Sequence, residues 1–218
     1  VTAEAGFKET ENFGRLEYSF SELVKNCGID MTECSLIEEN GRAHFLTKRF
    51  DRENGRKIHM QTLCGMAHYD FRLKNGHSYE QAFNVMRRLR LPYSQAQEMF
   101  RRIVFNVVVR NQDDHTKNIS FLMDSSGQWS LSPAYDMGFA YNPLGAWTAT
   151  HQMSINGKFD NITRADLLSL ANANNIKSAS EIIDQVCETT AGWPELAKNC
   201  GVPQKMIDGI VPHMFLNI

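Results

Sequence analysis

The sequence predicts an α+β fold, in which a small mixed lobe up to about residue 50 precedes a mainly helical lobe. One helical pattern and two strand-like runs around a tight turn account for the small lobe. Apolar stretches with three-and-four spacing dominate the remainder, as expected for packed helices. The 218 residues are 42% hydrophobic and 22% charged, which is ordinary globular usage and excludes a disordered or fibrous chain.

The small lobe begins, after an aperiodic stretch over residues 1–13, with a predicted helix over Leu16–Asn26. Its apolar residues share one face, and Gly28 stands just past its end, where glycine commonly caps a helix. Cys34–Ile37 and His44–Thr47 are strand-like runs around Glu39-Asn40-Gly41, a turn sequence that favours a hairpin. The chain therefore builds a helix and a two-stranded ribbon first.

The polar, turn-rich segment Arg49–Lys57 is expected to leave this sheet as a loop. A helix is predicted over Ser78–Leu89, opened by a capping serine. The strongest helical pattern covers Ser94–Val109, with Arg101 and Arg102 expected on the side opposite its apolar face. Further elements are predicted as strands at Ile119–Met123 and Trp129–Leu131, an irregular segment at Ser132–Phe159, and helices at Arg164–Ala173, Ser180–Ala191 and Pro203–Phe215.

Charge and cysteine usage narrow the class of protein. The formal net charge is −2, which argues against direct nucleic-acid binding, because phosphate backbones require clustered positive charge. No apolar run reaches the roughly 18 residues of a membrane helix. Five scattered cysteines without CxxC spacing indicate buried thiols in a reducing, cytoplasmic setting. Val1 is no initiator methionine and no signal peptide follows it, so we expect a fragment or a processed product.

Reactive side chains are concentrated in Arg110–Asn118, which follows the apolar helix, and in Ser132–Gly138, which follows the predicted hairpin. Because a hairpin returns the chain to its start, Asn118 and Asp136 at its base are expected to lie side by side. Asp113 stands five residues before Asn118, as the catalytic base and metal-binding Asn do in the kinase pattern D-x-x-x-x-N. The spacing therefore places three oxygen-bearing side chains around one point.

Phosphoryl transfer explains these residue types. Asp113 would orient and deprotonate the attacking hydroxyl, while Asn118 and Asp136 would hold Mg²⁺, a cation that prefers oxygen ligands. Asp136-Met137-Gly138 has the D-x-G form of the kinase metal-binding element. His115 occupies a position near the transferred phosphate. The pattern predicts a kinase-like fold and an ATP- and Mg²⁺-dependent kinase.

Other interpretations of these residues stay open. Asp113, Asp114 and His115 could ligate the metal of a phosphohydrolase, although no second histidine-rich cluster accompanies them. Structural or surface roles are the plain interpretation of three other histidines, His59, His68 and His151. Core packing is the plain interpretation of three aromatic residues, Trp129, Tyr135 and Phe139.

Longer motifs resemble a known family. The segments RRIVFNVVVRNQDDHTKNISFLMD, WSLSPAYDMGFAYNP and HQMSINGK are similar to the C-terminal lobe of HipA-like serine/threonine kinases, and LTKRFDRENGRKIHMQTL is similar to their hinge. The resemblance covers about Gly14 to His213. It implies that Asp113 is catalytic and that Asn118 and Asp136 bind magnesium. It implies ATP contacts from two groups of residues, His115, Thr116, Lys117, Asn118 and Tyr135 in the lobe and Lys48, Arg49 and Phe50 in the hinge.

The resemblance also implies partners. Members of this kind are bacterial toxins that phosphorylate Ser or Thr on a protein, commonly of the translation machinery, and are paired with a helix-turn-helix antitoxin. Their phosphate-covering loop and ATP-contacting lysine precede the segment that matches LEYSF, where this chain has only about fifteen residues, and no apolar strand holds Lys8. We therefore expect residues 1–50 to be a remnant of the N-terminal lobe with the hinge, and residues 51–218 to be the C-terminal lobe. The isolated chain is expected to be inactive or weakly active, and a pseudokinase-like binding fragment is the alternative.

Overall fold

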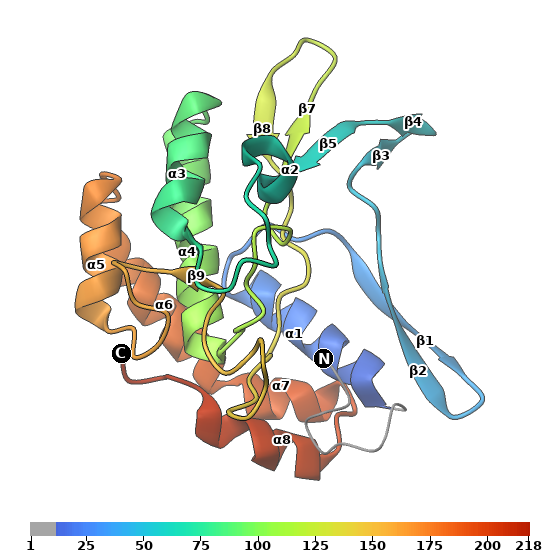
Figure 1. The fold of residues 1–218 in the computed structure, drawn as a ribbon. Helices are drawn as coiled ribbons and strands as arrows, with labels where there is room; N and C mark the ends of the chain where they lie inside the picture. The colour runs from blue at the N-terminus through green and yellow to red at the C-terminus, as the bar shows by residue number, and fades with distance from the viewer. Residues whose placement is uncertain (1–11) are drawn as a thin grey trace.

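The computed structural model describes residues 12–218 and has the mixed architecture predicted from the sequence (Figure 1). Lys8 and most of the aperiodic start lie outside the described residues. The elements in chain order are α1 (Phe13–Asn26), β1 (Cys34–Glu39), β2 (Arg42–Thr47), β3 (Arg52–Glu53), β4 (Arg56–Lys57), β5 (His59–Thr62), α2 (Leu63–Ala67), β6 (His77–Ser78), α3 (Tyr79–Arg88), α4 (Tyr93–Val109), β7 (Ser120–Met123), β8 (Trp129–Leu131), β9 (Met153–Ser154), α5 (Arg164–Ala173), α6 (Ala179–Ala191), α7 (Trp193–Asn199), α8 (Gln204–Ile210) and a 3₁₀ turn, η3 (Val211–His213).

Helix α1 is held on two sides. Its predicted apolar face is buried, and the Phe20 ring stacks on Trp193 of α7 at 4.7 Å between ring centroids. On the opposite side Gly14 meets β2 so closely that a Cβ at this position would lie 2.1 Å from the Ala43 carbonyl oxygen. Gly28 ends the helix with φ +74°, which confirms the predicted glycine cap. Because Gly14 has no Cβ, α1 can approach the β1–β2 hairpin this closely.

The β1–β2 hairpin is the predicted one and projects from the body as an arm (Figure 1). Asn40 and Gly41 alone form its loop, with φ of 51° and 77°. Positive φ at both central residues is the geometry that matches the strand twist in two-residue hairpins, and Asn-Gly adopts it readily. Glu39 pairs with Arg42, so each strand runs two residues further toward the turn than its apolar pattern indicated.

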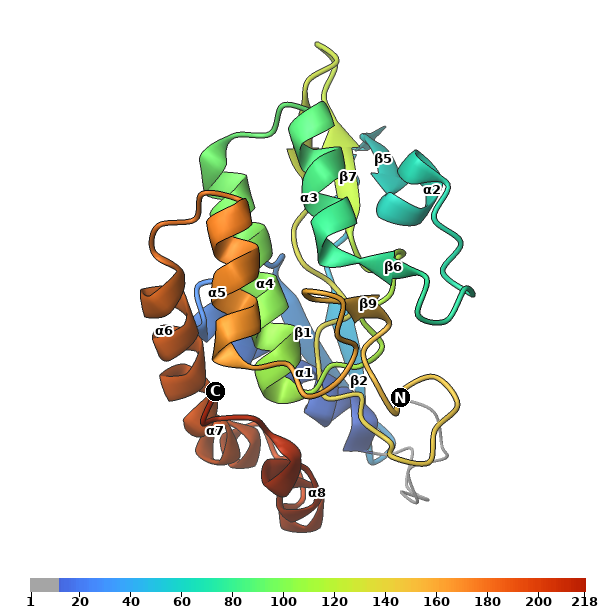
Figure 2. The same ribbon diagram turned by 60° about the vertical axis from the view of Figure 1, so that its left-hand side comes forward.

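The core of the larger lobe is built around α4, which lies between the α5–α6 pair and the strands (Figure 2). Its last two turns are buried almost all round, as the apolar run predicted. Arg102 is a correction, because it was expected on the exposed side but is only 7% exposed. Its guanidinium nitrogen Nε lies 2.7 Å from Oε1 of Glu98, one turn earlier, and this ion pair permits the burial.

Several elements differ from those predicted from the sequence. The segment Arg49–Lys57 contains the small β3–β4 hairpin instead of a plain loop, and the unpredicted β5 adds to β7 in the antiparallel sheet β5-β7-β8. The unpredicted α7 carries Pro194 in its first turn, where a missing N–H is harmless. The expected single helix Pro203–Phe215 is instead α8 followed by η3, and Pro212 lies at the start of that turn.

The long irregular segment is more ordered than the sequence indicated. His151–Ile155 is buried throughout, and β9 pairs in parallel with β6. Asp166 at the start of α5 holds the end of this segment, because its carboxylate accepts hydrogen bonds from Asn156, Lys158 and Thr163. The irregular segment is therefore anchored at its C-terminal end by one buried side chain.

All five cysteines are free thiols; Cys27 and Cys34 are buried and the other three are partly exposed. The prediction of buried thiols is therefore right for two of the five. Among the helices of the part of the chain that the structure describes, none is long and apolar enough to cross a membrane.

Replacing Gly14 by Ala should destabilise the protein by about 1–3 kcal/mol, because the added methyl group collides with backbone atoms of β2 that cannot rotate away. Gly65→Ala in α2 is the matched control, since its Cβ would meet only the Thr62 hydroxyl at 3.5 Å. We expect that control to be neutral or stabilising by up to about 1 kcal/mol. Urea unfolding of both variants makes the comparison, and equal effects would contradict the close-contact argument.

Replacing Asp166 by Asn should lower the free energy of unfolding by about 2 kcal/mol at pH 7. Burial alone would raise the pKa of Asp166, but hydrogen bonds from Lys158, Thr163 and Asn156 hold it well below its ordinary range. A depressed folded-state pKa contributes stability above the unfolded-state pKa of about 4 and loses it as the pH falls. The difference between wild type and variant should therefore shrink below about pH 4; a constant difference would contradict this assignment.

Candidate active site

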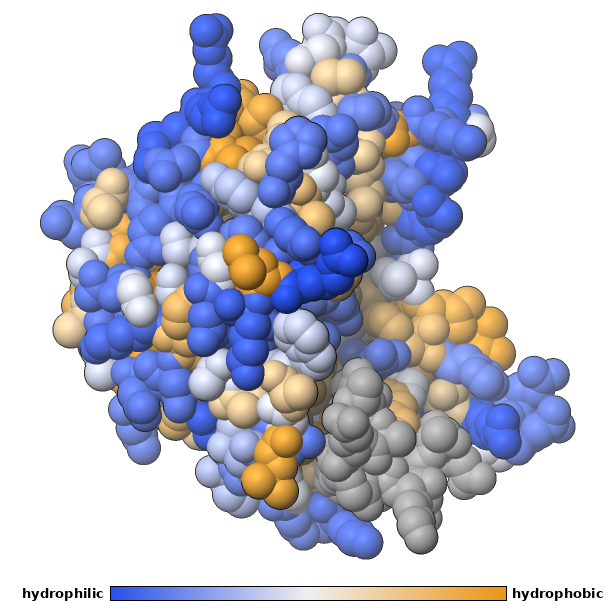
Figure 3. All heavy atoms as spheres, in the orientation of Figure 1, coloured by the Kyte–Doolittle hydropathy of each residue, from blue (hydrophilic) through white to orange (hydrophobic). Residues whose placement is uncertain are grey.

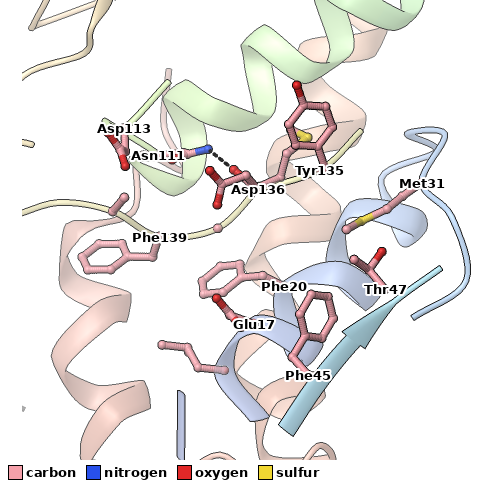
Figure 4. A pocket seen from close by; sticks show the side chains of 14 residues that line it. Glu17, Phe20, Met31, Phe45, Thr47, Asn111, Asp113, Tyr135, Asp136 and Phe139 are labelled. Carbon is pink, nitrogen blue, oxygen red and sulfur yellow. Dashed lines mark hydrogen bonds between the residues drawn. The ribbon is translucent and has the colours of Figure 1, made fainter. Parts of the chain in front are cut away.

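An apolar cavity of about 310 Å³ lies between α1, β2 and the two polar loops of the larger lobe (Figure 4). Phe20 and Phe45 line it from α1 and β2, and Tyr135 and Phe139 line it from the opposite side. In the space-filling view the molecule is hollowed between the β1–β2 arm and the upper part of the body (Figure 3). The cavity therefore has aromatic walls contributed by both halves of the chain.

Three carboxylates from three separate segments line this cavity: Glu17 of α1, Asp113 and Asp136. Burial raises the pKa of Glu17, and the negative charge of Asp136 adds to the shift. Burial also raises the pKa of Asp113; the nearby His115 opposes the shift, and Asp136 reinforces it. Of residues 12–218, no lysine or arginine lines the cavity. The site therefore concentrates negative charge and favours a cation.

The end of α4 positions the first polar loop. Arg110 adopts the left-handed conformation at φ 55° and ends the helix, so the chain turns sharply into Asn111. The Gln112 amide then donates to the Ala140 carbonyl at 3.1 Å, and the Ala140 amide donates to the Arg110 carbonyl at 3.1 Å. These two bonds join the loop of Asp113 to the chain that follows Asp136.

Asp114 is the buried counterpart of Asp113. The Asp113 side chain is 45% exposed, whereas that of Asp114 is 1% exposed. Oδ2 of Asp114 accepts from the Tyr79 hydroxyl at 2.7 Å and lies 2.8 Å from Nδ1 of His151, and Oδ1 accepts from the Gln152 amide at 2.7 Å. Burial and the charge of Asp114 raise the pKa of Tyr79 well above its ordinary value, which keeps the phenol a donor.

This arrangement bears on the phosphohydrolase interpretation. Asp114 is saturated by partners inside the protein and faces away from the cavity that Asp113 lines, so the two carboxylates and His115 do not form one ligand set. Within residues 12–218 no three His, Cys, Asp or Glu side chains gather into a metal site. The structure also places His151 in a buried structural role, as its plain interpretation held.

The hydrogen bonds continue from Asp114 to the second metal-ligand candidate. Nδ2 of Asn106 donates to the Tyr79 hydroxyl at 3.0 Å, and Nδ2 of Asn111 donates to Oδ1 of Asn106 at 3.0 Å. The Asn111 amide also contacts the Asp136 carbonyl at 3.3 Å, the bond drawn in Figure 4. Asp136 itself has φ 55°, a conformation that needs such support in a residue other than glycine.

Asn118 is oriented by the same loop. Its Nδ2 donates to the Asp113 carbonyl at 2.9 Å, so this bond does not use the side-chain oxygen Oδ1. Asp136 lines the cavity and Asn118 does not, so the expectation that these two side chains lie side by side stays a prediction. As donor types, the amide oxygen of Asn118 and the carboxylate of Asp136 fit Mg²⁺, which keeps several waters and typically takes only one or two protein oxygens beside substrate phosphates.

The remaining predicted contacts of the lobe are distributed differently. Tyr135 lines the cavity, and its hydroxyl donates to the Lys117 carbonyl at 2.5 Å. Thr116 is buried and bonds the Tyr69 carbonyl, so it supports the loop. Lys117 places Nζ 3.4 Å from the centre of the Phe71 ring, and His115 stands edge-on to the same ring. Of these residues, only Tyr135 lines the apolar cavity beside Asp136 and Asp113.

The hinge residues lie at the edge of the cavity and not in its wall. The Lys48 amide donates to the Glu33 carbonyl at 2.9 Å, and Arg49 forms an ion pair with Asp51. The Phe50 ring packs near Tyr135, with 5.6 Å between centroids. The wall itself is formed here by Phe45 and Thr47, immediately before the predicted hinge.

Sequence reasoning missed two kinds of residue. Glu17 was not predicted as a site residue, because it lies in an amphipathic helix whose sequence pattern indicates only which face packs against the core. The sequence places Glu17 next to Leu16 and three residues before Phe20, and this closeness to the apolar face is the signal that could have indicated its burial. Asn111 and Tyr79 act through a buried hydrogen-bond chain that no local spacing reveals.

Comparison with known proteins identifies the family of the chain. The family described as the HipA-like C-terminal domain matches residues 4–193. "Putative kinase Y4dM" of Sinorhizobium fredii is 28% identical over 90% of this chain and 52% of its own length. A "Putative kinase" of Haemophilus influenzae is 29% identical over 55% of this chain and 39% of its own length. The chain spans about half the length, or less, of these curated relatives.

Two solved structures share the fold. HipA of Shewanella oneidensis, determined in complex with HipB and operator DNA, superposes with a TM-score of 0.68 at 20% identity, over 91% of this chain and 52% of that one. The proinflammatory kinase CtkA of Helicobacter pylori gives 0.56 at 14% identity, over 94% and 85%. The predicted kinase-like α+β fold is thereby confirmed. The match over residues 4–193 shows that the chain belongs to the HipA-like C-terminal domain family.

Proposed function

We propose that this chain carries the nucleotide- and metal-binding half of an ATP- and Mg²⁺-dependent protein serine/threonine kinase. The observation that carries the proposal is the meeting of Glu17, Asp113 and Asp136 in one aromatic-walled cavity. Aromatic walls suit a nucleobase, and clustered carboxylates suit the magnesium that accompanies phosphates. The kinases that share the fold support this assignment.

The proposed roles follow from how each side chain is held. Asp113, partly exposed and next to the cavity, would orient the acceptor hydroxyl and take its proton. Asn118 and Asp136 would hold Mg²⁺, which supplies charge neutralisation for the phosphates. His115, whose Nε2 lies 4.0 Å from Oδ1 of Asp113, would stand beside the phosphoryl group in transfer. The hinge residues Lys48, Arg49 and Phe50 would border the base.

Glu17 suggests where the phosphate clamp attaches. A helix carboxylate that binds a phosphate-contacting lysine is part of the kinase mechanism. We propose that Glu17 receives such a lysine from outside residues 12–218, whose positive charge would oppose the rise that burial causes in the pKa of Glu17. On this view residues 1–50 belong to the small lobe and hinge, and residues 51–218 form the C-terminal lobe.

The partners are proposed from those of a protein that shares the fold. HipA of Shewanella oneidensis is found with HipB and DNA, and we propose an analogous antitoxin partner for the whole protein, with a cytoplasmic protein as phosphorylated substrate. The alternative, a fragment that binds without catalysis, predicts nucleotide or partner binding without phosphoryl transfer. The binding and transfer measurements below separate these functions.

Asp136→Ala or Asn118→Ala should weaken Mg²⁺-nucleotide binding by roughly tenfold or more, because each removes one of only two protein oxygens on the metal. Calorimetric titration with a non-hydrolysable ATP analogue, with and without Mg²⁺, measures the effect. Asp124→Ala, an exposed aspartate in the β7–β8 turn, is the matched control. Unchanged affinity in both site variants would contradict the metal assignment.

Asp113→Asn should leave nucleotide affinity within about twofold, since Asp113 is assigned no metal or nucleotide contact. In the protein as its gene encodes it, the same change should lower phosphoryl transfer by roughly 10²–10⁴-fold, the usual contribution of a general base. Radiolabelled phosphate incorporation measures transfer. Transfer at the wild-type rate would eliminate Asp113 as the base, and absence of transfer in wild type would favour the binding fragment.

A further inference from the structure

A second, smaller cavity also reaches Asp113. Its volume is about 210 Å³, and it is lined by Phe71, Arg72, Asp113, His115, Trp147 and Gln152. Among residues 12–218, Asp113 alone lines both cavities. Its carboxylate, 45% exposed, therefore separates the proposed nucleotide site from a distinct space. A hydroxyl that Asp113 deprotonates can reach it from this second space while a nucleotide fills the first.

Two polar side chains of the second cavity, Arg72 and Gln152, are engaged by other residues, whereas Nδ1 of His115 has no hydrogen-bond partner among the described residues. The Arg72 guanidinium bonds both carboxylate oxygens of Asp70, each at 3.0 Å. Nε2 of Gln152 donates to the carbonyls of Trp147 and Thr150. What the wall offers an occupant is thus the carboxylate of Asp113, the imidazole of His115 and the aromatic surfaces of Phe71 and Trp147. Trp147 is 50% exposed, although tryptophan is on average a highly buried residue.

The walls are fixed in place by contacts between distant segments. Nζ of Lys74 donates to the Ala146 carbonyl at 2.8 Å, which joins the loop of Phe71 to the loop of Trp147. Nζ of Lys117 lies 3.4 Å from the centre of the Phe71 ring and supports it from the catalytic loop. The aromatic side chains therefore belong to a built surface and not to a free tail.

We propose that this cavity selects the acceptor, and that its occupant is a protein segment with a Ser or Thr next to a large apolar side chain. The proposal rests on the kinase function proposed above and names the substrate class of that site. A volume of about 210 Å³ is below the roughly 300–1,000 Å³ that whole small-molecule ligands occupy, but it has room for one side chain. A sugar or other polyol would need several polar partners, and the wall presents one carboxylate and one imidazole beside two aromatic side chains. Phe71 and Trp147 would hold the apolar side chain while the hydroxyl meets Asp113.

Peptides with one central Ser in a Gly/Ala background, and with Phe placed at each neighbouring position in turn, test the proposal. Binding is measured by fluorescence anisotropy on the protein as its gene encodes it, both without nucleotide and with Mg²⁺ and a non-hydrolysable ATP analogue. We expect one or two Phe positions to bind about tenfold tighter than the parent peptide. Trp147→Ala and Phe71→Ala should each abolish that gain, and Trp147→Ala should do so with unchanged thermal unfolding and unchanged nucleotide affinity.

Leu144→Ala is the matched control, because Leu144 is 94% exposed in the same loop as Trp147 and lines neither cavity. It should keep the full gain. The proposal is overturned if no Phe position improves binding or if the gain survives in both aromatic variants. It is also overturned if Asp or Glu at the same positions gives a larger gain than Phe, because Arg72 would then be the group that selects the peptide. A wild-type protein that binds no nucleotide defeats the kinase assignment instead, and the peptide series without nucleotide still decides the acceptor cavity.

Discussion

The buried carboxylate of Asp114 is the interaction on which the site depends. Removing a charged group from water is costly unless hydrogen bonds compensate it, so Asp114 requires Tyr79, His151 and the Gln152 amide to be in place. These partners come from α3 and from the buried segment around β9, far apart in the sequence. By fixing Asp114 inward, they hold its neighbour Asp113 at the surface between two cavities.

The same hydrogen-bond chain reaches Asp136 through Asn106 and Asn111. Side chains proposed for proton transfer and for metal binding are therefore positioned by one continuous polar network inside a lobe whose core is otherwise apolar. A fully satisfied buried network is rigid, because each member would lose its partner if another moved. Rigidity of this kind suits a site that has to bring a metal, a phosphate and a hydroxyl into one geometry.

The other half of the first cavity depends on packing and not on polar contacts. Gly14 allows α1 to touch the backbone of β2, and Trp193 covers the opposite side of the helix on Phe20. Glu17 is directed at the cavity only because both contacts hold α1 in this orientation. The family relatives and the two kinase structures share the fold in which this arrangement occurs.

Local patterns in the sequence determined much of the fold. The Asn-Gly turn, the Gly28 cap, the Ser78 capping box and the apolar repeat of α4 each act over a few residues, and each was predictable for that reason. The spacing of Asp113, Asn118 and Asp136 indicated a kinase, and the family match confirms that relationship while the individual roles stay predictions. Only the tertiary structure decided what depends on distant partners: the burial of Arg102, the strand β5, the inward turn of Asp114, and the presence of Glu17 in the cavity wall. Long-range contacts of this kind leave no period or motif, because the free energy that fixes them comes from packing segments that the sequence separates.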